Sequence, residues 1–135
     1  MIKAVIFDYD WVLNQFIFWP KPEMYKLAHS LRGRGVRTAV LSNRVAPLSW
    51  IAKLSDNLKD FEPVVFARES GTLKPNPKAY QLVINKLGLK PEECLFIDNR
   101  LDNINGAEAI GLHVLLVRDT EHAIESIEHL IKASL

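Results

Sequence analysis

Five short apolar runs, separated by segments with helical spacing, restrict the fold of this chain more than any other feature. The runs are rich in Val, Ile, Leu and Phe and lack polar alternation, so we expect strands that are buried on both faces. Alternating strands and helices predict a parallel sheet with right-handed crossovers and helices on both faces. The runs cover residues 2–7, 36–41, 64–67, 94–97 and 113–117.

The segments between the runs are predicted to be helices. Pro22, Pro47 and Pro77 open three of them, and proline is favoured in the first turn because its missing N–H is not needed there. We therefore expect one domain over residues 1–135, an α/β, doubly wound three-layer sandwich around a five-stranded parallel sheet. The predicted helices cover residues 22–34, 47–58, 77–87, 102–110 and 121–132.

Length, charge and cysteine content narrow the class of protein. A chain of 135 residues can bury a core without a disulfide or a structural metal. The formal net charge of +1 does not favour nucleic acid or anionic lipid as a partner. Cys94, the only cysteine, lies in an apolar run and is expected to be a buried, inert thiol. The sequence shows no membrane-length segment and no signal-peptide pattern, so we expect a cytoplasmic location.

Polar residues follow several of the predicted strands. In doubly wound sheets, ligands bind at the carboxyl ends of the strands, near the point where the strand order reverses. We therefore expect these residues to gather around one phosphate-sized site. They are Asp8 and Asp10 after the first strand, Ser42 and Asn43 after the second, Lys74 in the loop beyond the third, and Asp98 and Asn99 after the fourth.

This set of residues suits phosphoryl transfer through a covalent aspartyl-phosphate. Asp8, at the strand tip, is the candidate nucleophile. Asp10 points to the same side of an extended backbone, and it can protonate the leaving oxygen and then deprotonate the attacking water. Ser42, ahead of a helix N-terminus, and Asn43 are the candidate phosphate ligands. The Lys74 ammonium offsets the repulsion between carboxylate and phosphate.

Mg²⁺ is the expected cofactor. It is a hard cation that takes oxygen ligands and keeps several of its waters. The candidate ligands are Asp8, Asp10, Asp98 and Asn99. Without the metal and Lys74, an anionic nucleophile would have to approach a dianion.

The arrangement resembles the haloacid dehalogenase-like (HAD) superfamily. The matching stretches are residues 6–13 (IFDYDWVL), 41–43 (LSN), 74–77 (KPNP) and 96–103 (FIDNRLDN), which occur in the order of the family. The resemblance implies a sheet of order 5-4-1-2-3 and, most often, a Mg²⁺-dependent phosphatase. It also implies that Asn103 braces the last of these loops.

Two residues depart from the pattern of the family. The position after the second Asp is usually Gly, and here it is Trp11. A bulky residue lacks the backbone freedom of glycine, so we expect an altered loop. Many relatives carry two adjacent acids in the fourth stretch, where this chain has Asp98 and Asn99. An amide oxygen can still bind Mg²⁺, and the lost negative charge predicts weaker metal binding.

The spacing of the motifs leaves no room for the cap domain that larger relatives carry. A short loop and one helix separate Asp8 from Ser42, and one helix and one strand separate Ser42 from Lys74. An open site admits a phosphorylated small molecule or a phosphorylated macromolecule. The aromatic segment, residues 11–19, offers a flap over the site, a homodimer surface or packing under the first helix. Trp50 is expected in the core, and Asp102 is expected to start a helix.

Three other functions compete with a phosphatase. A receiver domain has the same residue types in another order, since here Lys74 precedes Asp98 and no acid ends the third strand. A dehalogenase needs a closed apolar pocket and no second acid, so Asp10 and the missing cap disfavour it. A catalytically weak or inactive scaffold that binds a partner or a phosphate stays open because of Trp11 and Asn99. The hydrolase is the interpretation that we favour.

Overall fold

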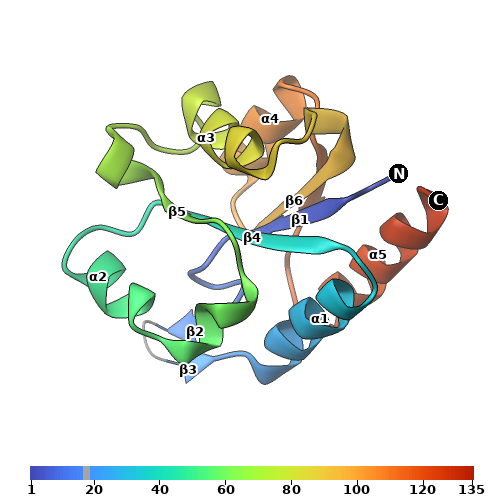
Figure 1. Ribbon diagram of the computed structural model, residues 1–135, viewed down its shortest axis with the longest axis horizontal. Coiled ribbons are helices and arrows are strands. Elements are labelled where there is room, and N and C mark those ends of the chain that lie inside the picture. The colour runs from blue at the N-terminus through green and yellow to red at the C-terminus, as the bar shows by residue number, and fades with distance from the viewer. Residues whose placement is uncertain (17–18) are drawn as a thin grey trace.

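The five predicted strands form one parallel sheet through the centre of the molecule (Figure 1), in a computed structural model that describes residues 1–16 and 19–135. The sheet has the order β5-β4-β1-β6-β7, and every neighbouring pair is parallel. Counted in chain order, these are strands 3-2-1-4-5, which confirms the predicted topology. The strands are β1 Ala4–Phe7, β4 Arg37–Ser42, β5 Val64–Phe66, β6 Cys94–Asp98 and β7 His113–Leu116.

Helices cover both faces of the sheet. On one face, α1 (Pro22–Gly33) and α5 (Thr120–Ala133) pack against each other and against β4 and β7 respectively. On the other face, α3 (Pro77–Leu87) lies over β4 and β5, and α4 (Leu101–Ala109) lies over β6 and β7. Figure 1 shows the two helix layers on opposite sides of the sheet. The predicted three-layer sandwich is therefore confirmed.

Each face of the sheet has its own core because successive side chains of a strand point to opposite faces. In β1, Val5 and Phe7 pack with residues of α1 and α5. Ala4 and Ile6 pack with residues of α3 and α4. The central strands β1 and β6 are buried on both faces, as their unbroken apolar runs predict, whereas the edge strand β7 is only partly buried. Polar side chains are thereby directed to the ends of the strands.

The predicted helix over residues 47–58 is wrong in extent. The structure has a short α2 (Leu48–Lys53) and then a 3-10 helix, η1 (Asp56–Asp60). The two helices are separate because the Ser55 side chain accepts a hydrogen bond from the Asn57 N–H and starts η1 as its N-cap. Two further 3-10 helices are η2 (Ala67–Ser70) and η3 (Pro91–Glu93).

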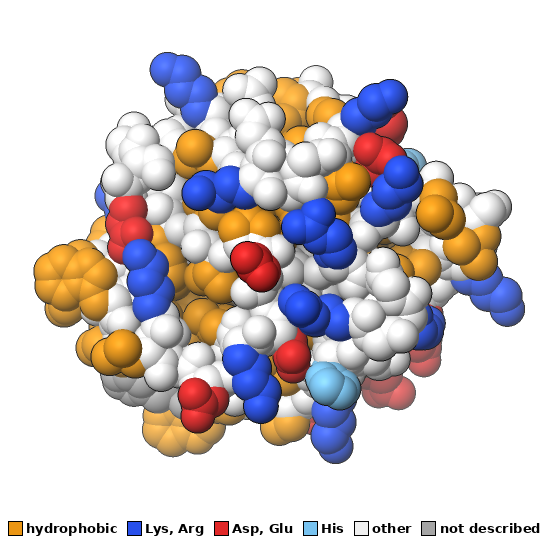
Figure 2. All heavy atoms as spheres, viewed as in Figure 1, with side chains coloured by type: hydrophobic (Ala, Val, Ile, Leu, Met, Phe, Trp, Pro, Cys, Tyr) orange, Lys and Arg blue, Asp and Glu red, His pale blue; other side chains and the backbone are white. Residues whose placement is uncertain are grey.

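The expected core position of Trp50 is also wrong. The buried face of α2 consists of Ser49 and Ala52, which are three residues apart and share one side of the helix. Trp50 points away from that side and is 59% exposed, and Ile51 and Leu54 beside it are exposed as well. Figure 2 shows hydrophobic side chains gathered at the left edge of this face, over α2.

A two-stranded antiparallel sheet follows the first loop. It joins β2 (Asn14–Phe16) to β3 (Trp19–Pro20). The predicted aromatic segment, residues 11–19, includes residues 17 and 18, which lie outside the described residues. Its predicted roles as a flap or a dimer surface stay predictions.

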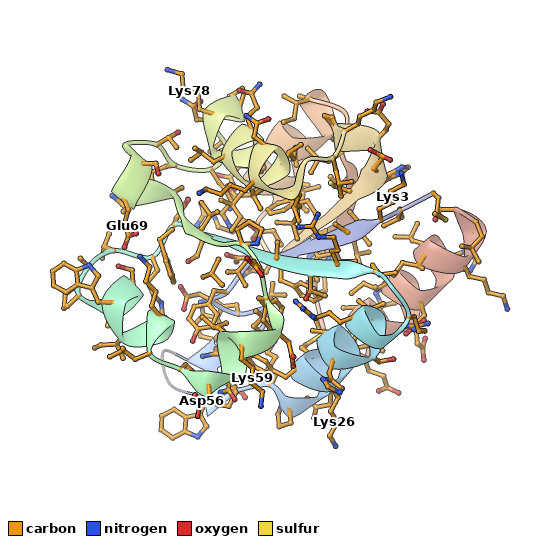
Figure 3. The ribbon with its side chains drawn as sticks, viewed as in Figure 1. Lys3, Lys26, Asp56, Lys59, Glu69 and Lys78 are labelled. Carbon is orange, nitrogen blue, oxygen red and sulfur yellow. The ribbon has the colours of Figure 1, made fainter. Side chains whose placement is uncertain are left out.

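Charges of both signs are mixed over the face drawn in Figure 2. Lys3, Lys26, Lys59 and Lys78 lie at the periphery of the fold (Figure 3). Among the helices of the described residues, none combines the length and the apolar character that crossing a membrane requires.

Candidate active site

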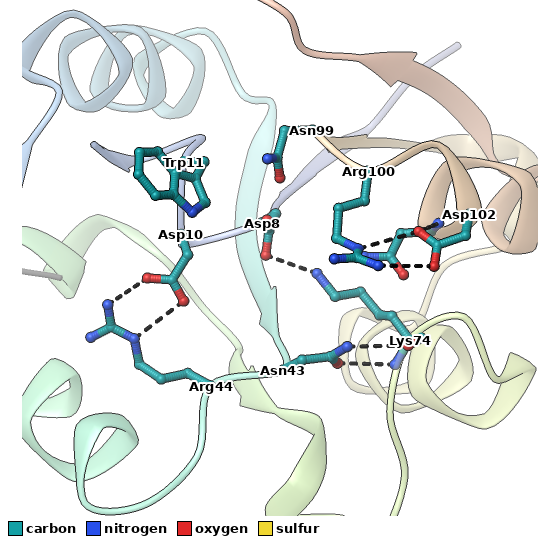
Figure 4. A pocket seen from close by; sticks show the side chains of 10 residues that line it. Asp8, Asp10, Trp11, Asn43, Arg44, Lys74, Asn99, Arg100 and Asp102 are labelled. Carbon is teal, nitrogen blue, oxygen red and sulfur yellow. Dashed lines mark hydrogen bonds and ion pairs between the residues drawn. The ribbon is translucent and has the colours of Figure 1, made fainter. Parts of the chain in front are cut away.

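A cavity of about 370 Å³ opens at the carboxyl ends of the central strands. Its walls come from the loops after β1, β4 and β6 and from the loop that contains Lys74 (Figure 4). The chain thus brings together residues that lie up to about 90 positions apart, as the strand-end argument predicts. Of the predicted site residues, the cavity is lined by Asp8, Asp10, Asn43, Lys74 and Asn99.

The ammonium of Lys74 lies at the centre of the site. This buried group lies 2.8 Å from Asp8 Oδ1, 2.9 Å from Asp98 Oδ2 and 2.9 Å from the carbonyl oxygen of Leu41. These three acceptors match the three N–H donors of an ammonium. Asn43 positions the backbone of the same residue, since its Oδ1 accepts from the Lys74 N–H at 2.9 Å and its Nδ2 donates to the Lys74 carbonyl at 3.1 Å. Both ends of Lys74 are therefore fixed.

Burial controls the charges of this cluster. It raises the pKa of Asp8 from 3.8 to about 7, opposed by the Lys74 ammonium and assisted by the negative charge of Asp98. Burial also acts to lower the pKa of Lys74, but the two carboxylates outweigh it and raise that pKa above its usual value. Lys74 is thus an ammonium at neutral pH, shared between Asp8 and Asp98.

Asp98 faces the protein rather than the cavity. It is fully buried, and its Oδ2 accepts from the Lys74 ammonium and, at 3.0 Å, from Asn103 Nδ2. Its Oδ1 accepts from the Arg100 N–H at 3.0 Å. Asn103 braces this loop, as the resemblance implies. In this arrangement Asp98 orients Lys74, whereas the neighbouring Asn99 lines the cavity.

Arg44 is a site residue that sequence reasoning missed. Its Nη2 lies 2.5 Å from Asp10 Oδ1 and its Nε lies 3.3 Å from Oδ2 (Figure 4). The guanidinium carbon lies 4.6 Å from the centre of the Tyr9 ring, and the residue is only 6% exposed. The sequence contained a signal for this residue, because Arg44 directly follows Ser42 and Asn43, in the loop after β4 where site residues were predicted.

Ser42 is not among the residues that line the cavity. It is fully buried, and its Oγ accepts a hydrogen bond of 3.0 Å from the Arg44 N–H. The hydroxyl therefore shapes the loop that carries Arg44, and its predicted role as a phosphate ligand stays a prediction.

An exposed ion pair forms the opposite rim. Arg100 and Asp102 line the cavity, with Arg100 Nε 3.3 Å from Asp102 Oδ1. The hydrogen bonds from Arg100 lower the pKa of Asp102. Asp102 lies in the first turn of α4, where an acid was expected. Arg100 places a further positive charge at the cavity and was not predicted.

The loop after β1 carries Trp11 in an unusual backbone conformation. Its φ of 70° makes it the one non-glycine residue in the left-handed region among the described residues. The Trp11 N–H donates to the Asn14 carbonyl at 2.6 Å, and its own carbonyl accepts from Lys21 Nζ at 2.7 Å. Trp11 thus adopts the backbone that the family usually gives to glycine, and its indole lines the cavity.

The cavity offers the kind of ligand that Mg²⁺ prefers. Asp8, Asp10 and Asn99 present carboxylate and amide oxygens there, and hard cations take such donors. Within residues 1–16 and 19–135, no three His, Cys, Asp or Glu side chains form a group that could hold a metal. A third carboxylate at the cavity, that of Asp102, is paired with Arg100.

Comparisons with known proteins show the family of the chain. The model of the haloacid dehalogenase-like hydrolase family matches residues 12–111. Acyl-CoA dehydrogenase family member 10 of Mus musculus is 33% identical over 110 residues, which are 82% of this chain and 10% of that protein. Glyceraldehyde 3-phosphate phosphatase of Methanopyrus kandleri is 31% identical over 101 residues, 73% of this chain and 43% of that protein. The chain thus spans less than half the length of either relative.

Solved structures share the whole fold. An uncharacterized protein from Corynebacterium glutamicum matches with a TM-score of 0.85 and 25% identity, over 96% of this chain and 95% of that one. A HAD family enzyme of Bacteroides thetaiotaomicron, in complex with magnesium and inorganic phosphate, matches with a TM-score of 0.76 and 17% identity, over 91% and 99%. From the family match, the fold and the order of its strand-end residues, the chain belongs to the haloacid dehalogenase-like hydrolase family.

Proposed function

We propose that this chain hydrolyses a phosphomonoester through an aspartyl-phosphate on Asp8, with Mg²⁺ held by Asp8, Asp10 and Asn99. The observation that carries the proposal is the ammonium of Lys74, 2.8 Å from Asp8 and 2.9 Å from Asp98. It places a fixed positive charge beside the only strand-tip carboxylate that also faces the cavity among the described residues. A phosphatase among the relatives supports the same reaction class.

The reaction has two displacements at phosphorus. In the first, an Asp8 oxygen attacks phosphorus, the bond to the ester oxygen breaks, and Asp10 gives its proton to the departing oxygen. In the second, Asp10 takes a proton from water as that water attacks phosphorus. The bond to the Asp8 oxygen then breaks, which releases inorganic phosphate and restores the carboxylate.

Lys74 and a bound Mg²⁺ would both offset negative charge at the reacting phosphate. The Lys74 ammonium stabilises the charge that builds up on the phosphoryl oxygens, and Asp98 holds it in place. When bound, Mg²⁺ would neutralise the repulsion between the carboxylates and an incoming dianion. We propose Asn99 rather than Asp98 as the ligand from the loop after β6, because Asp98 is buried and accepts three hydrogen bonds from the protein.

A non-catalytic scaffold that binds a phosphate ligand or a partner is the competing proposal. It is favoured by the contact of Arg44 with both carboxylate oxygens of Asp10, because Asp10 must carry a proton to act as an acid. A cytoplasmic location and a homodimer through residues 11–19 belong to the proposal as well.

Phosphate release from 4-nitrophenyl phosphate tests the two proposals. We expect release with Mg²⁺, loss of release with excess EDTA, and loss in Asp8→Asn. Asp56→Asn is the matched control, because Asp56 is an exposed acid in η1, away from the cavity. Release that survives in Asp8→Asn would contradict the aspartyl-phosphate. Phosphate binding by the wild type, with no release above buffer, would favour the scaffold.

A further inference from the structure

A larger groove adjoins the cavity described above. It has a volume of about 750 Å³ and lies between the segment that ends β3 and begins α1 and the start of α5. Trp11 lines both this groove and the cavity that contains Asp8 and Lys74. The indole therefore forms the boundary between them, and a molecule whose phosphate lies in the cavity can continue over Trp11 into the groove.

The chain holds Trp11 there in a strained conformation. A bulky residue at a φ of 70° is an outlier that persists only when its surroundings enforce it. Here the N–H of Trp11 is fixed by the Asn14 carbonyl and its carbonyl by the Lys21 ammonium. Glycine would meet the same backbone requirement without strain. The side chain is nevertheless half exposed, so core packing alone does not account for it.

The walls of the groove indicate what it can hold. Pro20, Pro22 and Ile124 add apolar surface to that of the Trp11 indole. Their charged neighbours are mostly acidic, namely Glu23, Asp119 and Glu121. The one cation of the groove among the described residues, Lys21, already donates to the Trp11 carbonyl. A second anionic group on the substrate would meet repulsion here, whereas an apolar group would be buried.

We infer that Trp11 and this groove bind the leaving group of the substrate, and that the preferred substrates are phosphomonoesters of apolar, uncharged alcohols. The inference rests on the proposed function for the place of the phosphate. An aromatic or long alkyl leaving group stacks on the indole and extends between β3 and the start of α5. Esters that carry a second carboxylate or phosphate are disfavoured.

The catalytic test compares phenyl phosphate with methyl phosphate in the wild type, Trp11→Phe and Trp11→Gly. Loss of the indole should lower kcat/KM for phenyl phosphate about tenfold through a higher KM, a change equivalent to about 1.4 kcal/mol, and change methyl phosphate less than about twofold. Trp11→Phe should keep most of the preference, because a ring remains. Trp50→Ala, at an exposed indole of α2, is the control and should change neither substrate. Equal losses on both esters in Trp11→Gly would overturn the inference.

A binding test separates this inference from the proposed reaction. The sequence has three tryptophans. Trp11 is therefore the only one left in a variant that carries Trp19→Phe, Trp50→Phe and Asp8→Asn. Phenyl phosphate should change its fluorescence and bind about tenfold more tightly than inorganic phosphate or 3-phosphoglycerate. Such binding without turnover in the wild type would overturn the proposed reaction and leave the subsite standing. Equal affinities and an unchanged emission would overturn the subsite.

Discussion

At the scale of single residues, two buried carboxylates share one ammonium. Lys74 lies within 2.9 Å of both Asp8 and Asp98, so the cluster carries one negative charge more than it can neutralise. Burial raises the pKa of the Asp8 carboxyl to about 7, opposed by the Lys74 ammonium and assisted by the negative charge of Asp98. The metal-free site is therefore under electrostatic strain at neutral pH, which a cation at the cavity would relieve.

Replacing Asp8 by Asn should stabilise the metal-free protein at pH 8 but not at pH 4. Because the pKa of Asp8 rises from 3.8 to about 7 on folding, the folded state keeps its proton to higher pH than the unfolded state does. The associated stability is present below about pH 4 and is lost as the pH rises through about 7.

We expect Asp8→Asn to gain about 2 kcal/mol in the free energy of unfolding at pH 8, measured by urea unfolding with EDTA. The difference between the variant and the wild type should shrink toward zero at pH 4. An Asp8→Asn protein that is less stable than the wild type at pH 8 would contradict this account of the cluster.

We expect Asn99 to influence how strongly the cavity binds Mg²⁺. It lines the cavity with Asp8 and Asp10, and its neutral amide stands where a second acid is common in the family. Asn99→Asp should tighten Mg²⁺ binding about tenfold, the effect of about 1.4 kcal/mol of added attraction. Calorimetric titration of Mg²⁺ into both proteins measures the difference, and equal affinities would count against Asn99 as a ligand.

At the scale of elements, α4 lies against the loop that carries Lys74. A Cβ on Gly106 of α4 would lie 2.7 Å from Pro75 Cβ and 2.8 Å from the Pro75 carbonyl oxygen. Only a residue without a side chain lets the helix approach so closely. The contact braces the loop immediately after Lys74, and α4 therefore helps to aim the ammonium.

Gly106→Ala should destabilise the protein by about 1 to 3 kcal/mol, because backbone or helix must shift to accommodate the methyl group. Gly33→Ala is the matched control in α1, where a Cβ would meet nothing within 4 Å. That substitution should be neutral or stabilising by up to about 1 kcal/mol. Thermal unfolding of the two variants provides the comparison, and equal effects would refute the close contact.

At the scale of the whole molecule, the central sheet buries the thiol of Cys94. Cys94 begins β6, between β1 and β7, and it is fully buried. Burial raises the pKa of its thiol to about 11. As the sequence predicted, this cysteine is placed as an inert core residue.

Cys94 should therefore react with a thiol reagent only when the core opens. At pH 8 we expect labelling of the native protein to be at least about a thousandfold slower than labelling in urea, given ordinary domain stability. The time course of absorbance with Ellman's reagent measures both rates. Labelling of the native protein at the rate seen in urea would show that β6 is accessible without unfolding.

The pattern of residues along the chain was enough to predict the sheet order and the gathering of Asp8, Lys74 and Asp98. Unbroken apolar runs identify strands buried on both faces, and the topology of parallel sheets then brings the strand ends together. These inferences depend on periodicity and chain order, which are properties of the sequence. The same reasoning placed Cys94 in the core.

Other features depend on where side chains point once distant segments have packed. Arg44 pairs with Asp10, which is 34 positions away, and Asp98 turns from the cavity toward Lys74. Trp50 faces outward because the inner side of α2 is formed by other residues. A one-dimensional pattern says which residues reach the same edge of the sheet. Their orientations follow from long-range contacts, whose geometry the folded chain alone contains.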